Sequence, residues 1–280
     1  MSPDHFAEHL EVLSKDYLVM HLSELVRYLK KGQLPKRGVV LTFDDGYADN
    51  FWNAKPLLEN FGIPATVFVT SGRIDSPTEF WWDDLERVLL QPGNLPKRLE
   101  LFIQGQSYPW PTTSVEEREL AYMDIHQILQ PLSDSERNPV ISDMITWADT
   151  DPMGRTDYLP LTTDELIQLA RSEFVEIGAH TVSHSFLSVM TEVEQHDEIA
   201  GSRNKLEEII GCCVDTFSYP YGNLSSDTVS IVKAAGFKGA LTVDENTVEV
   251  GVNPFQLGRF GVGDWNSEEF KHHLDEFFRT

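Results

Sequence analysis

The sequence predicts an α/β fold built on a parallel sheet or barrel, and three observations support this prediction. Short, continuous apolar runs recur along the chain, as in parallel strands that are buried on both faces. Segments with helical spacing of apolar residues separate these runs, so strands and helices alternate. The length of 280 residues fits one large barrel or two smaller domains, and a composition of 41% hydrophobic and 24% charged residues is typical of a folded protein.

The N-terminal part of the chain reads as two helices followed by a strand, a helix and a second strand. Apolar residues recur at helical spacing within residues 6–29, and residues 38–43 form the first continuous apolar run. Residues 47–61 are helical in pattern, and residues 65–70 form the second apolar run. This order is that of a parallel strand, helix, strand unit.

The C-terminal half continues the alternation. Further strands are expected at residues 174–178, 216–219 and 239–243. Helices are expected at residues 163–171, 191–210 and 226–235. Alternation of this kind predicts that all these strands lie parallel in one sheet or barrel.

Between about residues 72 and 161 the alternation lapses. We expect this stretch to be a partly helical insertion, with a helix around residues 115–129, in a chain that otherwise forms a single catalytic domain over residues 1–280. Trp81 and Trp82 in the insertion could stack on sugar rings, although tryptophans in such a setting more often belong to a core.

The net charge of −23 argues against nucleic acid and anionic membranes as partners, because the field of the protein would repel both. A neutral or cationic substrate, or a metal cation, suits this charge better. The N-terminus lacks a positively charged segment followed by an apolar run, and no run of about 18 apolar residues occurs, so we expect no signal peptide, no membrane span and a cytoplasmic location.

Candidate chemical groups follow two of the predicted strands. Asp44 and Asp45 come directly after the first apolar run, and His180 and His184 come just after the strand at 174–178. The carboxyl ends of parallel strands are where such folds place their active sites. Two carboxylates and two imidazoles at this edge could hold a divalent cation, whereas the Asp-Asp-Gly segment alone could equally be a surface turn.

Three segments together resemble the successive motifs of the polysaccharide deacetylase (NodB-homology, carbohydrate esterase 4-like) family. They are Thr-Phe-Asp-Asp-Gly-Tyr at 42–47, His-Thr-Val-Ser-His at 180–184 and Phe-Ser-Tyr-Pro-Tyr-Gly at 217–222. The similarity extends from about residue 39 to 264, interrupted by the insertion. It implies a distorted (β/α)-barrel and metal-dependent hydrolysis of the N-acetyl group of an amino sugar in a polysaccharide or glycan precursor.

The resemblance also implies roles for individual residues. Asp44 would be the general base, and Asp45, His180 and His184 would hold a divalent metal ion, with Zn²⁺ the leading candidate. The backbone N–H of Tyr221 would stabilise negative charge that develops on the acetamide oxygen. Three residues are expected to line the substrate site: Tyr219, Pro220 and Trp265.

The sequence departs from the family pattern in two places. Ser218 stands where the family has an arginine that pairs with the base, and Arg259 is our candidate to replace it, although a surface arginine is an equal alternative. No general-acid histidine is evident near the C-terminus, where His272 and His273 are expected to face solvent. Because some relatives carry this histidine on an N-terminal strand, we expect a truncated or divergent N-terminus.

Two other functions stay open at this point. One is hydrolysis of a small non-sugar amide or imide, since relatives of this barrel include such hydrolases. The other is a non-catalytic carbohydrate-binding protein with a vestigial site, which the missing acid and the substituted arginine favour. The oligomeric state, the sugar and the identity of the metal cannot be inferred from the sequence.

Overall fold

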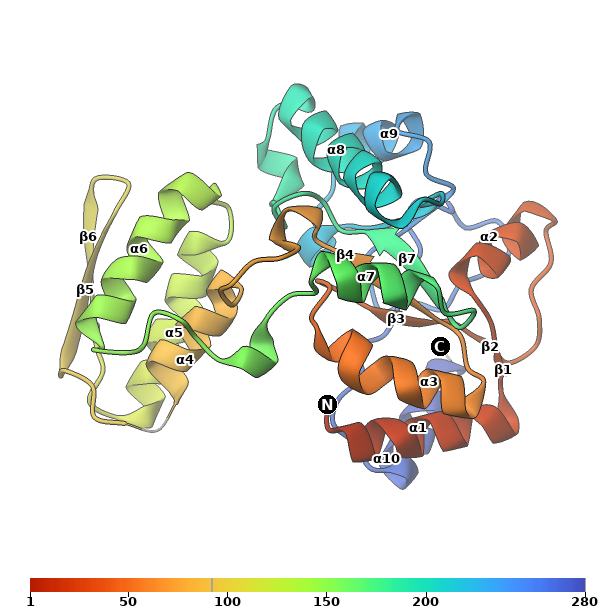
Figure 1. The fold of residues 1–280 in the computed structure, drawn as a ribbon, viewed down its shortest axis with the longest axis horizontal. Helices are drawn as coiled ribbons and strands as arrows, with labels where there is room; N and C mark the ends of the chain where they lie inside the picture. Colours follow the sequence, from red (N-terminus) through yellow and green to blue (C-terminus); the bar gives the residue numbers. More distant parts are fainter. Residues whose placement is uncertain (92, 280) are drawn as a thin grey trace. The chain divides into compact units, whose positions relative to one another are not determined.

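The computed structural model describes residues 1–91 and 93–279, and these residues form two compact units. The first unit combines residues 1–75 with the chain from Leu161 onward. The second unit, Ser76–Pro160, occupies the stretch in which an insertion was expected. Each unit is described by itself below (Figure 1).

A five-stranded parallel sheet forms the centre of the first unit and confirms the predicted α/β class. Its strands are β3 (Leu41–Phe43), β4 (Ala65–Val69), β7 (Val175–Ala179), β8 (Thr216–Ser218) and β9 (Gly239–Leu241), in that spatial order. The sheet curls into a half-barrel (Figure 1). Every residue of β4 is buried, as the continuous apolar run predicts for a central parallel strand.

The first predicted strand is interrupted. Residues 38–43 divide into β2 (Gly38–Val39), which pairs in parallel with β1 (Leu18–Val19), and β3, which joins the main sheet. Apolar character alone does not reveal such a break, because the apolar run continues through it and both pieces are half-buried. The predicted helix over residues 47–61 likewise begins as a π-helix, η1 (Asn50–Ala54), before α3 (Lys55–Phe61).

Helices surround the half-barrel. They are α1 (Pro3–Asp16), α2 (Leu22–Lys30), α3, α7 (Thr163–Ala170), α8 (Glu192–Ile210), α9 (Ser226–Ala234) and α10 (Ser267–Phe277). Both α7 and α8 contact β7, and α1 packs on α3 and α10 (Figure 1). The side chains of Thr162 and Thr191 begin α7 and α8 with capping boxes, which satisfy orphan N–H groups at the helix ends.

The second unit is a helical cluster with a hairpin. It contains α4 (Trp81–Leu90), the antiparallel strands β5 (Arg98–Ile103) and β6 (Gln106–Pro111), α5 (Val115–Leu129) and α6 (Asp134–Trp147). Helix α5 was predicted from the sequence, whereas the hairpin and the other two helices were not. Trp81 is buried beneath the Arg137 guanidinium, 4.8 Å from its ring centroid, as a core tryptophan would be.

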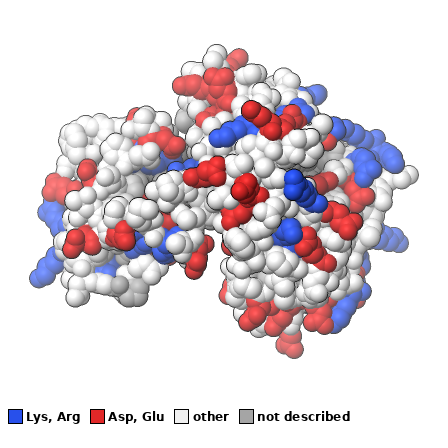
Figure 2. All heavy atoms as spheres, viewed as in Figure 1, with Lys and Arg blue, Asp and Glu red and all other residues white. Residues whose placement is uncertain are grey.

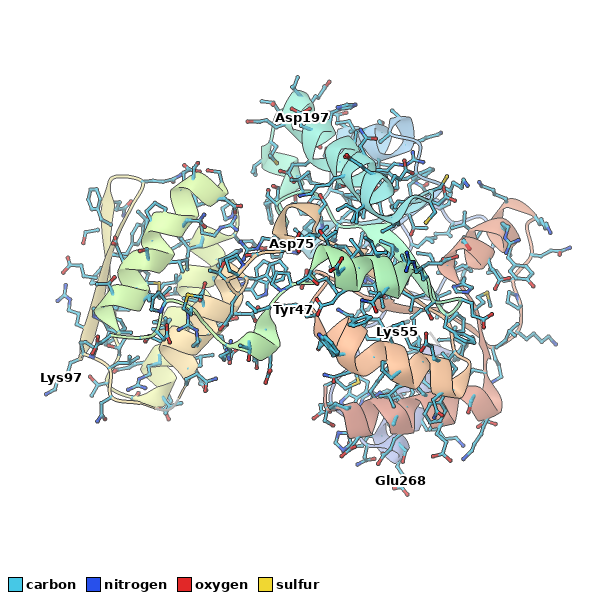
Figure 3. The ribbon with its side chains drawn as sticks, in the orientation of Figure 1. Tyr47, Lys55, Asp75, Lys97, Asp197 and Glu268 are labelled. Carbon is cyan, nitrogen blue, oxygen red and sulfur yellow. The ribbon has the colours of Figure 1, made fainter. Side chains whose placement is uncertain are left out.

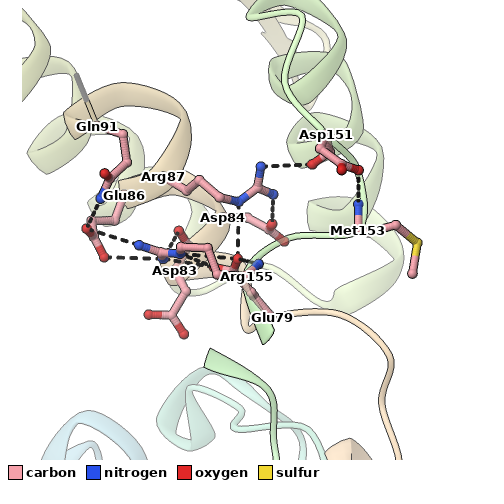
Figure 4. Close-up of polar contacts among 9 residues, drawn as sticks. All are labelled: Glu79, Asp83, Asp84, Glu86, Arg87, Gln91, Asp151, Met153 and Arg155. Atoms are coloured by element: carbon pink, nitrogen blue, oxygen red, sulfur yellow. Dashed lines mark hydrogen bonds and ion pairs between the residues drawn. The ribbon is translucent and has the colours of Figure 1, made fainter. Parts of the chain in front are cut away.

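A buried ion-pair network joins the two ends of this unit (Figure 4). The carboxylate of Glu79, which is fully buried, lies 3.2 Å from Arg87 and 2.8 Å from Arg155. Arg87 also pairs with Asp84 at 2.5 Å. Because Glu79 precedes α4 and Arg155 follows α6, this network ties the entry of the segment to its exit.

Acidic side chains are spread over the visible face of both units, in keeping with the net charge of −23 (Figure 2). Within the described residues, no helix combines the length and the apolar character that crossing a bilayer requires.

Candidate active site

Asp45, His180 and His184 converge at the carboxyl end of the sheet. Asp45 lies two residues past β3, and His180 directly follows β7. The Oδ1 atom of Asp45 is 3.4 Å from Nε2 of His180 and 3.2 Å from Nε2 of His184. One ligand atom from each of the three residues can be chosen so that all lie within 4.8 Å of one another. The structure therefore brings together the three residues expected to hold a metal ion.

An unusual backbone conformation orients these side chains. Asp45, Thr181 and His184 all have positive φ, at 72°, 63° and 57°. This left-handed conformation is uncommon for residues other than glycine and is concentrated at functional sites. Gly46 also has positive φ, at 82°, and a Cβ atom there would lie 2.9 Å from Val69 Cγ1, so the turn after the two aspartates requires glycine.

Hydrogen bonding defines which nitrogen of His180 can bind a cation. Its Nδ1 lies 2.8 Å from the carbonyl oxygen of Ser218, which can only accept, so Nδ1 carries the proton that it donates. In the neutral ring, Nε2 then directs a lone pair toward Asp45. The lone pair of His180 Nε2 and the Asp45 Oδ1 atom, 3.4 Å apart, repel each other unless a proton or a cation lies between them. A carboxylate oxygen and two imidazole nitrogens are a donor set that zinc and similar ions accept, with positions left open, so these residues fit such an ion.

Charges in the site oppose the effect of burial. Burial alone would raise the pKa of the Asp45 carboxyl, but the imidazoles of His180 and His184 outweigh it and hold this pKa well below its usual range. Burial likewise acts to lower the pKa of His180, and the carboxylates of Asp44 and Asp45 reverse that effect and raise it. At His184 burial prevails, so its pKa is lowered and the neutral, metal-binding ring is favoured.

Arg259 holds Asp44 with two hydrogen bonds. Its Nη1 donates to Oδ1 at 2.8 Å and its Nη2 donates to Oδ2 at 2.5 Å. The same guanidinium donates to the hydroxyls of Thr42 and Ser218, at 3.1 and 2.9 Å. Burial would raise the pKa of Asp44, but His180 and Arg259 together hold it below its usual value. Asp44 is thus an oriented, ionised carboxylate, and its Oδ2 lies 3.9 Å from His180 Nε2.

Tyr221 lies beside the histidines. It occupies a turn, η5 (Pro220–Gly222), with φ 58° and ψ 10°. Its ring meets that of His184 edge-to-face at 4.5 Å. The residue expected to supply a backbone N–H is therefore adjacent to one of the three candidate ligands.

The three residues expected to line the substrate site are placed differently. The side chain of Tyr219 is fully buried and donates its hydroxyl proton to the carbonyl of Phe255, so it contributes to the core and not to a substrate surface. Pro220 is also buried, in the turn before Tyr221. Trp265 stacks on His273 of α10 at 3.9 Å.

A cavity of about 630 Å³ opens beside Asp44. Its walls include Tyr47, Asn50, Arg259 and Phe260, and Trp265 is not among the residues that line it. No histidine lines it either, within the part of the chain that the structure describes. Asn50 belongs to the π-helix η1, a feature that is often found at functional sites.

Other histidines serve packing or surface contacts. His9 is buried, stacks on Phe270 at 3.9 Å and hydrogen-bonds to the carbonyl of Trp265 at 2.7 Å. His5 pairs with Asp264 at 2.9 Å. His273 was expected to face solvent, but its contact with Trp265 makes it a partly packed residue.

Comparison with known proteins identifies the family. A family model described as "Polysaccharide deacetylase" matches residues 31–95 and 141–240. The chain belongs to the polysaccharide deacetylase family. The match omits most of the second unit, while it includes Asp44, Asp45, His180 and His184.

Among curated relatives of this polysaccharide deacetylase, a poly-beta-1,6-N-acetyl-D-glucosamine N-deacetylase of Staphylococcus aureus (strain MSSA476) is 22% identical over 273 residues. These residues cover 97% of this chain and 70% of the relative. An enzyme of the same name from Staphylococcus epidermidis is 39% identical over 61 residues, which cover 22% of this chain and 21% of that enzyme.

Solved structures support the same fold. The Streptococcus pyogenes deacetylase PplD in complex with acetate superposes with a TM-score of 0.63 at 17% identity, covering 97% of this chain and 86% of that one. IcaB from Ammonifex degensii gives a TM-score of 0.61 at 18% identity, covering 98% and 88%. The predicted distorted barrel is thus confirmed as the fold.

Proposed function

We propose that this polysaccharide deacetylase hydrolyses the N-acetyl group of an amino sugar in a metal-dependent reaction that releases acetate and leaves a free amine. The observation that carries the proposal is the placement of Asp44. Its carboxylate is fixed by Arg259 and lies 3.9 Å from His180, next to a triad that suits a divalent ion.

The substrate class that we propose is a polymer of N-acetylglucosamine or a related glycan precursor. It rests on the names of the relatives from two Staphylococcus species. The negative charge of the chain supports it, because a neutral polymer that becomes cationic as it is deacetylated is not repelled. We propose further that residues 1–280 act as a single catalytic domain, with the second unit as its insertion.

In this proposal each residue of the site has one task. A divalent ion, most suitably Zn²⁺, held by Asp45, His180 and His184, would supply Lewis acidity and lower the pKa of water. Asp44 accepts the proton of the attacking water, and Arg259 keeps its carboxylate ionised and oriented. The backbone N–H of Tyr221 donates to the acetamide oxygen as charge develops on it. The Nδ1–H bond from His180 to Ser218 holds that ring in the ligating orientation.

The test is acetate release from N-acetylglucosamine oligomers by the metal-loaded chain, with and without a chelator, together with metal analysis of the same sample. Release that the chelator abolishes supports the proposal. Release that survives complete removal of metal contradicts the metal dependence, and no release despite stoichiometric metal contradicts the catalytic function.

One observation favours a second function, that of a carbohydrate-binding protein without turnover. No histidine is among the described residues that line the cavity beside Asp44, and the three candidate ligands lie outside that lining too, so these residues do not identify a general acid for the leaving amine. Loss of a general acid typically slows such a reaction by about 10²–10⁴-fold. Binding of oligomers by the metal-loaded chain without acetate release would identify this function.

A further inference from the structure

A carboxylate on α8 holds the turn between the two candidate histidine ligands. The Oε2 atom of Glu198 accepts hydrogen bonds from the backbone N–H groups of Val182 and Ser183, both at 2.9 Å. Its Oε1 atom accepts from the hydroxyl of Ser183 at 2.8 Å. Figure 3 labels Asp197, the residue that precedes Glu198 on this helix. A single side chain thus satisfies three donors within the five-residue segment from His180 to His184.

The turn that Glu198 holds is one that the backbone does not favour. Thr181 and His184 lie in the left-handed region, and neither is a glycine. Such residues keep this conformation only where the surroundings impose it. Because His184 is itself one of them, relaxation of the turn would rotate its imidazole away from Asp45 and His180.

Backbone hydrogen bonds from a second segment also hold the turn. The N–H groups of Ser71 and Gly72 donate to the carbonyls of Thr181 and Val182, at 3.1 and 2.7 Å. A Cβ atom at Gly72 would lie 2.5 Å from the Val182 carbonyl, so this close approach requires glycine. The segment is therefore held by hydrogen bonds from both the short helix η2 (Ser71–Arg73) and Glu198.

We propose that Glu198 is a positioning residue for the metal site, one that sets the separation and orientation of His180 and His184. This inference rests on the proposed metal-dependent function. Glu198 is not itself a ligand, since both of its oxygens accept hydrogen bonds from the turn and it is absent from the group of ligand atoms that converge. Carboxylates that support metal sites usually accept from the ring of a ligating histidine; Glu198 instead acts through the backbone, by fixing the turn that carries both ligands before the ion arrives.

The experiment is a zinc titration of the purified full chain, by calorimetry or chelator competition. Glu198→Ala should weaken zinc binding by about 10–100-fold, the usual effect of removing such a supporting group. Glu198→Gln should stay close to wild type, because one amide oxygen can still accept from both N–H groups. Glu208→Ala is the matched control, since Glu208 is an exposed glutamate of the same helix, and it should bind zinc as the wild type does.

A second measurement separates positioning from general stability. Cobalt-loaded Glu198→Ala should have an altered visible absorption spectrum, because the coordination geometry changes, whereas a folding defect alone would only reduce the loaded fraction. If Glu198→Ala does not fold, Glu198→Asp takes its place, as the shorter side chain cannot reach both N–H groups, and at least about a tenfold loss of affinity is expected. Wild-type affinity and spectrum in the folded variant would overturn the inference. Absence of zinc binding by the wild type would instead contradict the proposed function.

Discussion

Arg259 and Asp44, which are 215 residues apart in sequence, form a two-point ion pair with N···O distances of 2.8 and 2.5 Å. Paired, planar contacts of this kind fix the orientation of a carboxylate as well as its charge. Ser218, which stands where the family has an arginine, takes part in the same network by accepting from Arg259. The positive charge that orients Asp44 therefore comes from Arg259, in the irregular segment after β9, and not from position 218.

Replacing Asp44 with asparagine removes the proposed base and keeps the volume of the side chain. We expect acetate release to fall by at least about 100-fold, because general-base catalysis contributes on that order. Zinc content should stay near that of the wild type, since Asp44 is not among the three converging ligands. Activity assays and metal analysis on one preparation check both points. Undiminished release would remove Asp44 from the role of base.

Replacing Arg259 with lysine keeps the positive charge and loses the paired contact. We expect kcat to fall by up to about 100-fold with a smaller change in KM, because the carboxylate is no longer held in one orientation. Arg171→Lys, at an exposed position, is the control. Equal kcat values for the two variants would mean that the ion pair has no part in turnover.

Replacing His180 and His184 together with alanine should remove the metal. Two of the three converging donors are lost, and a single carboxylate does not retain zinc against a chelator. Metal analysis after dialysis should show less than about a tenth of the wild-type content if affinity falls 100-fold or more. Wild-type stoichiometry in this double variant would mean that the ion binds elsewhere.

Replacing Glu79 with alanine should destabilise the second unit. The fully buried carboxylate pairs with Arg87 and Arg155, and removing one partner of a buried network costs about 3–5 kcal/mol because charge is left uncompensated. Denaturant unfolding, followed by limited proteolysis within residues 76–160, measures the effect. Glu100→Ala, at an exposed site of the hairpin, should change stability by less than about 0.5 kcal/mol.

His9 should make stability fall in weak acid. Burial lowers the pKa of His9, so the folded state keeps the ring neutral at pH values where the unfolded state already binds a proton. The free energy of unfolding attributable to His9 is therefore constant above the unfolded pKa of about 6.5 and decreases as pH falls below it, until the folded pKa is reached. For the metal-free chain between pH 5 and 8, the free energy of unfolding should decrease less steeply with falling pH in His9→Gln than in the wild type. His272→Gln, at an exposed position, serves as the control for a histidine substitution outside the core.

Much of the fold and of the proposed ligand set could be predicted because both depend on local patterns. Continuous apolar runs locate the strands, and the ends of parallel strands locate Asp44, Asp45 and His180. The second unit was predicted less well, because the hairpin β5–β6 and the helices α4 and α6 lie outside the regular alternation. Tyr219 was expected to line the substrate site because it belongs to a family motif. In the structure its hydroxyl donates to the carbonyl of Phe255 within the core, a contact that the motif does not reveal.

Contacts between distant segments could not be predicted from one sequence. Glu198 is one of several glutamates on α8, and nothing in its neighbours distinguishes it until the helix packs beside the turn. The sequence also gives no sign that the Thr42 hydroxyl accepts from Arg259 or that the Ser218 carbonyl accepts from His180. Both contacts depend on which strands are neighbours in the sheet. Arg259 was a candidate only because Ser218 replaces the arginine expected from the family resemblance, so that another residue had to supply the positive charge.

The strand order β3-β4-β7-β8 also has a consequence for biogenesis. The aspartate comes from the first strand of the sheet and the imidazoles from the third, separated by more than 130 residues of chain that include the whole second unit. A nascent chain that has emerged only as far as Asp75 carries Asp45 but neither His180 nor His184. In zinc fingers the ion drives folding; here we expect the proposed ion to bind last, after the barrel and its turns have formed. Removal of the proposed ion should then leave the secondary structure of the first unit intact.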